Sequence, residues 1–125
     1  MSYQSSLIHI MDVQFQQHVD ETEFQSWLNQ VTDLLERQQR FVLVMQSAPE
    51  THFYDNYRLL QASWYKRYKD QFFQYCIGLA RIALDDADQV RLNSPALHAA
   101  WRVPYFVCLD HQEALQWALQ RWTPT

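Results

Sequence analysis

The sequence predicts an α/β fold: a mixed, mostly parallel sheet of about five strands with an N-terminal hairpin, covered by about four helices. Short, continuous apolar runs typical of strands buried on both faces occupy residues 41–45, 73–84 and 104–109. Segments with helical periodicity separate these runs, and helical crossovers imply parallel pairing. With 125 residues and 48% hydrophobic content, the chain is predicted to be a single domain over residues 1–125.

The N-terminal part has the alternation expected of strands. In residues 13–19, Val13, Phe15 and Val19 alternate with polar side chains, and residues 7–10 form a short, mostly apolar run. Met11 and Asp12 lie between the two segments. We therefore expect a hairpin that turns at these two residues.

A helix is predicted to begin after Asp20, where the period changes from two to three and four. Asp20 and Glu23 have the spacing of a capping box. The apolar stripe of this helix comprises Phe24, Trp27, Leu28, Val31, Leu34 and Leu35. The run at 41–45 follows and predicts a buried strand.

A second helix is predicted over residues 54–71, with Tyr57, Leu60, Trp64, Tyr68 and the adjoining Phe72 on its apolar stripe. Residues 73–84 are predicted to form the next buried strand. They contain Gly78, the only glycine in the chain. A glycine inside a strand indicates a bulge or a close approach of another part of the structure to the backbone.

The last third of the chain predicts a short helix, a strand and a final helix. Ser94 and Pro95 form a typical helix start, and this helix is expected to end near Trp101. After the strand at 104–109, Asp110 and Glu113 have the spacing of another capping box.

Composition excludes several classes of function. The formal net charge of −4 and the pI of about 5.6 provide no general attraction to nucleic acid or anionic membranes. No apolar run approaches the ~18 residues of a membrane span, and Cys76 and Cys108 lie in apolar runs rather than in a disulfide pattern. We expect a cytoplasmic protein without a cofactor.

The sequence contains no recognisable catalytic or metal-binding motif. The five histidines have no ligand spacing, and a chain with one glycine cannot form a glycine-rich phosphate loop. The cluster of Asp85, Asp86 and Asp88 is conceivable as a magnesium site, but it is more typical of a loop and helix start. The chain is therefore predicted not to be an enzyme.

Several of these segments together resemble a known family. Phe41–Met45, Tyr75–Ile82, Val103–Val107 and the closing stretch Asp110–Leu119 resemble the STAS family, the domain of bacterial anti-sigma-factor antagonists and sulfate-transporter tails. The uncharacterised STAS-like, or SpoIIAA-like, proteins of bacteria are the more similar branch.

The resemblance implies a regulatory function based on protein contacts. In STAS antagonists a serine that becomes phosphorylated lies just after a central strand. The matching stretch here, residues 46–51, contains Ser47 and Thr51 but lacks the Asp before and the Gly after the serine.

Three functions remain open from the sequence. The first is a non-enzymatic, regulatory protein-interaction module with an unidentified protein partner, which uses the loop at 46–54 and the helix start; the candidate contact residues are Ser47, Thr51, His52, Tyr54 and Tyr57. The second is a pocket for a small apolar ligand or lipid between the sheet and the helix at 54–71, lined by Tyr57, Trp64 and Tyr68. The third is an immunity protein against a co-encoded toxin. Formation of a homo-oligomer is compatible with each.

Overall fold

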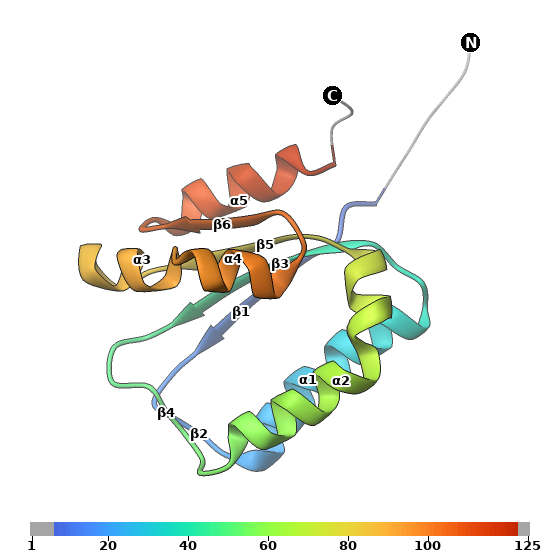
Figure 1. Cartoon of the computed structure of the whole chain (residues 1–125), viewed down its shortest axis with the longest axis horizontal. Coiled ribbons are helices and arrows are strands. Elements are labelled where there is room, and N and C mark those ends of the chain that lie inside the picture. The colour runs from blue at the N-terminus through green and yellow to red at the C-terminus, as the bar shows by residue number, and fades with distance from the viewer. Residues whose placement is uncertain (1–6, 123–125) are drawn as a thin grey trace.

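The computed structural model describes residues 7–122, which form an α/β fold with five helices and six strands (Figure 1). The strands are β1 (Ile10–Phe15), β2 (His18–Val19), β3 (Phe41–Ser47), β4 (His52–Phe53), β5 (Cys76–Ile82) and β6 (Tyr105–Cys108). The helices are α1 (Glu21–Glu36), α2 (Tyr57–Tyr75), α3 (Asp86–Leu92), α4 (Pro95–Trp101) and α5 (His111–Gln120). Within this part of the chain, no helix combines the length and apolar character needed to cross a bilayer.

The main sheet has four parallel strands in the order β1-β3-β5-β6. Each crossover moves one strand further in the same direction. With a constant hand of connection, such crossovers place their helices on one face of the sheet. Helices α1 and α2 lie together on that face, and α5 covers the opposite face (Figure 1).

The predicted N-terminal hairpin is wrong. Met11 and Asp12 lie inside β1, opposite Leu43 and Val44 of β3 in a parallel register. The chain changes direction later, at Gln17, which has a positive φ of 54°. Residues 18–19 then pair with β4 in a separate two-stranded parallel sheet. Alternation identified strand-forming residues but not their partners, and residues 11–12 lack the Asn or Gly that tight hairpin turns favour.

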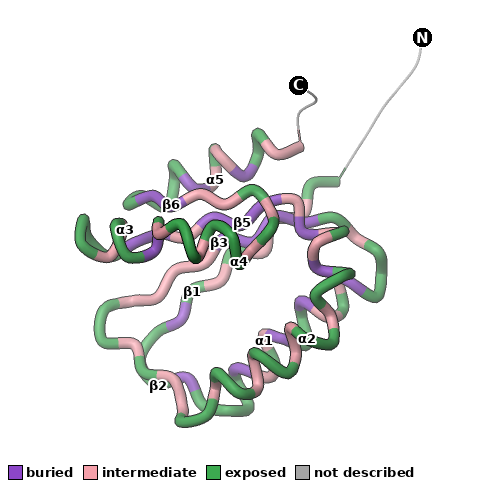
Figure 2. Tube along the Cα trace, in the orientation of Figure 1, coloured by how far each residue is buried: buried purple, intermediate pink, exposed green. Residues whose placement is uncertain are grey.

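Strand β3 is the centre of the hydrophobic core. Its side chains alternate between two clusters, as the period of a strand requires. Phe41 and Leu43 pack with residues of α1, α2 and β5, whereas Val42 and Val44 pack against α5. The purple trace in Figure 2 marks this buried centre. The prediction of a strand buried on both faces at 41–45 is confirmed.

The boundary between α2 and β5 differs from the prediction. Helix α2 begins at Tyr57, because Asn56 has a left-handed φ of 72°. It continues to Tyr75, so the first residues of the predicted strand at 73–84 are helical. The apolar run did not distinguish the two structures, because Phe73 and Tyr75 pack against the core from the last turn of the helix.

Two of the predicted helix caps are confirmed and one is wrong. Asp20 and Glu23 form the full capping box of α1, and the Ser94 hydroxyl accepts a hydrogen bond from the backbone of α4. Asp110 precedes α5, but its side chain makes no capping hydrogen bond. Its ψ of 129° departs from the values of 149° to 175° at Ser94 and Asp20.

Gly78 combines both features predicted for it. Phe41 pairs with Cys76 and Val42 with Gly78, so the register skips Ile77. A Cβ atom at Gly78 would lie 2.9 Å from the Trp117 ring and 3.0 Å from Cγ of Arg121. The bulge and the close approach of α5 therefore occur at the same residue.

The thiol of Cys76 is buried beside this bulge and donates a hydrogen bond to the Gly78 carbonyl, at 3.2 Å. Burial raises its pKa from 9.0 to about 12. A raised pKa means that the folded state holds the proton more tightly, so the stabilisation is complete below pH 9.0 and is lost as the pH rises towards 12.

We therefore expect the free energy of unfolding to fall more steeply above pH 9 in the wild type than in Cys76→Ala, by up to about 1.4 kcal/mol per pH unit. Urea denaturation of both proteins between pH 8 and pH 10.5 measures this difference. Parallel pH profiles would contradict the assignment to Cys76.

Candidate functional site

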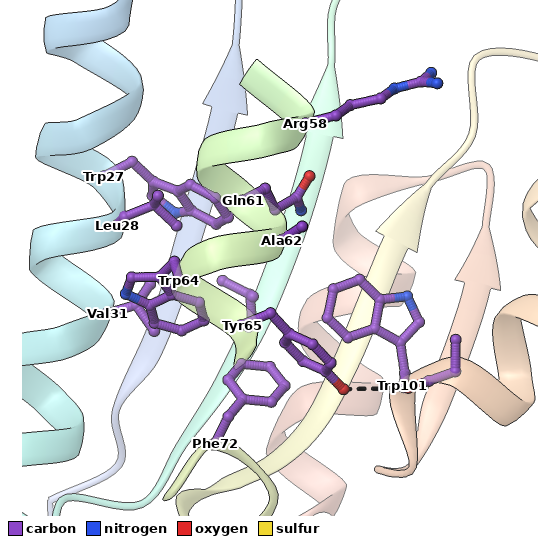
Figure 3. A pocket seen from close by; sticks show the side chains of 12 residues that line it. Trp27, Leu28, Val31, Arg58, Gln61, Ala62, Trp64, Tyr65, Phe72 and Trp101 are labelled. Atoms are coloured by element: carbon purple, nitrogen blue, oxygen red, sulfur yellow. Dashed lines mark hydrogen bonds between the residues drawn. The ribbon is translucent and has the colours of Figure 1, made fainter. Parts of the chain in front are cut away.

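A pocket of about 240 Å³ lies between α1, α2, α4 and β3 (Figure 3). We call it the apolar pocket, because most of the side chains around it are aliphatic or aromatic. The lining residues are Trp27, Leu28, Val31, Leu43, Arg58, Gln61, Ala62, Trp64, Tyr65, Phe72, Ala100 and Trp101.

The hydrophobic stripes of the fold build the wall of this pocket. Leu43 reaches it from the sheet, and Leu28 and Val31 reach it from the buried side of α1. On the opposite side, the Tyr65 hydroxyl donates to the Ala100 carbonyl, at 3.2 Å, and so ties α2 to α4. Figure 3 shows this bond and Trp101 on the side opposite Trp27.

Two of the three tryptophans in the wall have an unsatisfied N–H group. Nε1 of Trp64 donates to the Thr32 hydroxyl at 2.8 Å. Nε1 of Trp27 and Nε1 of Trp101 are both buried and have no hydrogen-bond partner within residues 7–122. Because both nitrogen atoms are fully buried, neither N–H group is accessible from the pocket.

A second cavity, of about 330 Å³, adjoins the first at the carboxyl ends of the parallel strands. We call it the edge cavity. It shares Trp27, Arg58, Gln61 and Trp101 with the apolar pocket. Its other lining residues are Phe15, Phe24, Met45, Ser47, Phe53, Tyr57, Arg81, Arg91 and Leu97. Open parallel sheets bind ligands at this edge.

One acidic residue lies beside the arginines of the edge cavity. Oδ1 of Asp88 is 2.6 Å from Nη2 of Arg91. Desolvation acts to raise the pKa of Asp88, but the hydrogen bonds from Leu84 and Arg91 and the positive charge of Arg81 outweigh it and lower the pKa. Asp85 caps α3 by accepting from the Asp88 backbone. The acidic cluster of the sequence therefore forms a helix start and an ion pair.

Comparison with protein-family models, with curated proteins and with solved structures found no match. The functional argument rests on the geometry of the two cavities, and the resemblance to the STAS family stays a prediction.

The residues predicted to contact a partner have different environments. Ser47 lines the edge cavity. The Thr51 hydroxyl donates to carbonyl groups of Phe15 and Ala48, and His52 is exposed in β4. Tyr54 is half-buried, with its hydroxyl unpaired within the described residues. Tyr57 stacks on Phe53 with ring centroids 4.6 Å apart. Partner binding through this loop stays a prediction.

The three residues predicted to line a ligand pocket are separated in the structure. Trp64 lies in the wall of the apolar pocket, and Tyr57 lines the edge cavity. Tyr68 belongs to neither wall and packs against Trp64, with centroids 5.4 Å apart.

Sequence reasoning missed Trp27, Trp101 and Arg81 as site residues. Trp27 was assigned only to the core stripe of its helix. Trp101 was noted only as the residue near the end of the predicted short helix. The signal for Arg81 was a charged residue near the carboxyl end of an otherwise apolar strand.

Proposed function

We propose that this chain is a non-catalytic domain that binds a small, mainly apolar molecule in the apolar pocket. The observation that carries the proposal is a pocket of about 240 Å³ whose wall is aliphatic or aromatic except for Arg58 and Gln61. A few polar groups in an apolar cavity are the usual composition of ligand pockets.

The composition of the wall favours a mainly apolar ligand. Apolar surface gains about 25 cal/mol per Å² when it is removed from water, and the aromatic and aliphatic side chains of the wall supply such surface. The Gln61 amide is a polar group in the same wall and can donate a hydrogen bond to a ligand. Such a ligand would be apolar over most of its surface and would carry at least one acceptor.

The volume of the pocket limits the size of the ligand. Sites for drug-sized molecules are typically about 300–1,000 Å³, and the apolar pocket has about 240 Å³. We therefore propose a short acyl chain or a small aromatic molecule rather than a whole membrane lipid.

The proposal is tested by filling the pocket. Ala100 and the neighbouring Ala99 are both exposed on the same helix, but only Ala100 lines the pocket. We expect Ala100→Phe to weaken binding of octanol at least about tenfold by occupying ligand volume, and Ala99→Phe to leave it unchanged. Because three tryptophans line the pocket, their fluorescence reports binding during a titration.

A second matched pair guards against a local distortion of α4. Ala62 and Ser63 are both exposed on α2, but only Ala62 lines the pocket. Ala62→Phe should weaken octanol binding and Ser63→Phe should not. If octanol does not bind the wild type, or if lining and control variants bind it equally, the proposed function is wrong.

A further inference from the structure

The edge cavity carries an excess of positive charge. Arg58, Arg81 and Arg91 line it, and none of its lining residues is acidic. Asp88, which faces the neighbouring depression lined by Ser47, Arg81 and Arg91, pairs with Arg91. Two arginines, Arg81 and Arg91, therefore share one carboxylate, that of Asp88. This local excess of positive charge contrasts with the net charge of −4 of the whole chain.

Arg81 is the central member of the three. It lies one residue before the end of β5 and is half-buried. It is on the sheet face of Leu79, because side chains two residues apart in a strand share a face. This is the face on which Leu79 joins the cluster formed with α1 and α2.

The groups around Arg81 leave part of its charge uncompensated. Asp88 is within its electrostatic range but is already paired with Arg91. Tyr105, the other neighbour, donates its hydroxyl hydrogen to the Leu92 carbonyl at 2.8 Å. Its oxygen accepts a hydrogen bond from Arg81, but a neutral hydroxyl does not cancel the charge. A cation that is partly removed from water without full pairing has an unfavourable desolvation energy. An anion in the edge cavity would pair with Arg81 and recover part of that energy.

The two cavities are neighbours that share part of their walls. Arg58 lines both, together with Trp27, Gln61 and Trp101. A molecule that extends from the apolar pocket past these residues would place its opposite end among the arginines. Arginine is well suited to a carboxylate or phosphate, because its planar fork donates two parallel hydrogen bonds.

We infer that the ligand is an amphiphilic anion, with its apolar part in the apolar pocket and a carboxylate or phosphate monoester held by Arg81 and Arg91 in the edge cavity. This inference rests on the proposed function and adds the chemical class of the ligand. Arg58, at the junction of the cavities, would contact the ligand between its two ends.

The experiment compares three eight-carbon probes: octanol, octanoate and octyl phosphate. Tryptophan fluorescence titrations at low salt measure the dissociation constant of each. We expect the better anion to bind at least about tenfold more tightly than octanol, because hydrogen bonds to charged groups are strong. Comparing octanoate with octyl phosphate then distinguishes the two sources of negative charge.

Arginine variants assign that difference to the edge cavity. Arg81→Met and Arg91→Met should each weaken binding of the preferred anion about tenfold and leave octanol unchanged. Arg91 is mostly exposed, so its variant retains a readout if Arg81→Met lowers the melting temperature. Arg67→Met is the matched control, since Arg67 lies over Tyr68 and lines neither cavity.

The possible results separate this inference from the proposed function. If octanol binds and both anions bind no more tightly, the inference is overturned and the apolar pocket stands. Equal anion affinities in Arg81→Met, Arg91→Met and Arg67→Met would overturn it as well. If octanol does not bind the wild type, the proposed function fails and the inference, which rests on it, fails with it.

Discussion

Replacing Phe41 with alanine is expected to lower the free energy of unfolding by about 3–5 kcal/mol. Phe41 has no exposed surface and lies in the first position of β3, in the cluster between the sheet and helices α1 and α2. Its ring meets Phe72 edge to face, with centroids 6.2 Å apart. The cost combines the lost burial of the ring with the cavity that it leaves, since the sheet and two helices limit collapse.

Urea denaturation measures this change against a matched apolar control. Leu59 is 69% exposed on α2, so Leu59→Ala removes a large apolar side chain that contributes little burial. We expect a change within about 0.5 kcal/mol for that variant. Similar losses for the two variants would mean that Phe41 does not occupy the core described here.

The sequence was most informative where a side-chain pattern alone determines the structure. The stripe from Phe24 to Leu35 fixed a helix that the Asp20 capping box begins, and the unbroken run at 41–45 required burial on both faces. Each signal is local. Nothing from a distant part of the chain is needed to interpret it.

Strand pairing and helix ends depended on tertiary structure and were predicted less well. The alternation at 13–19 was compatible with a hairpin, but pairing of β1 with β3 buries Phe15 against aromatic residues of α1 and β4. Helix α2 extends beyond its predicted end, because Phe73 and Tyr75 also pack against the core from a helical backbone. In both cases the apolar pattern predicted which residues are buried, but not the conformation or pairing of the backbone that carries them.

The candidate site could be predicted only in part for the same reason. Trp64 was assigned to a pocket because helix α2 was expected to face the sheet. The opposite wall comes from α4, whose Trp101 reaches Phe72 with centroids 5.9 Å apart. No spacing along the chain encodes the contact between α4 and α2, or the fact that Arg58 and Arg81 line one cavity.

Gly78→Val is expected to lower the free energy of unfolding by about 3 kcal/mol or more, at the upper end of overpacking effects. A valine normally favours a strand over glycine, and Gly78 does not have a positive φ, so the backbone itself would accept the change. The steric clash with Trp117 makes the net effect on the free energy of unfolding unfavourable. The new Cβ would lie 2.9 Å from Cη2 of Trp117 before its two methyl groups are added.

Trp117 cannot easily move away. Its ring stacks on Phe106 with centroids 5.3 Å apart and an interplanar angle of 11°. On the indole ring, the guanidinium of Arg121, just after α5, lies 4.5 Å from the ring centroid. A double-mutant cycle tests this cause: in a Trp117→Leu background, Gly78→Val should lose at least about 1 kcal/mol of its cost. An unchanged cost in that background would show that the clash with Trp117 is not what requires glycine at this bulge, and the bulged backbone would have to be its source.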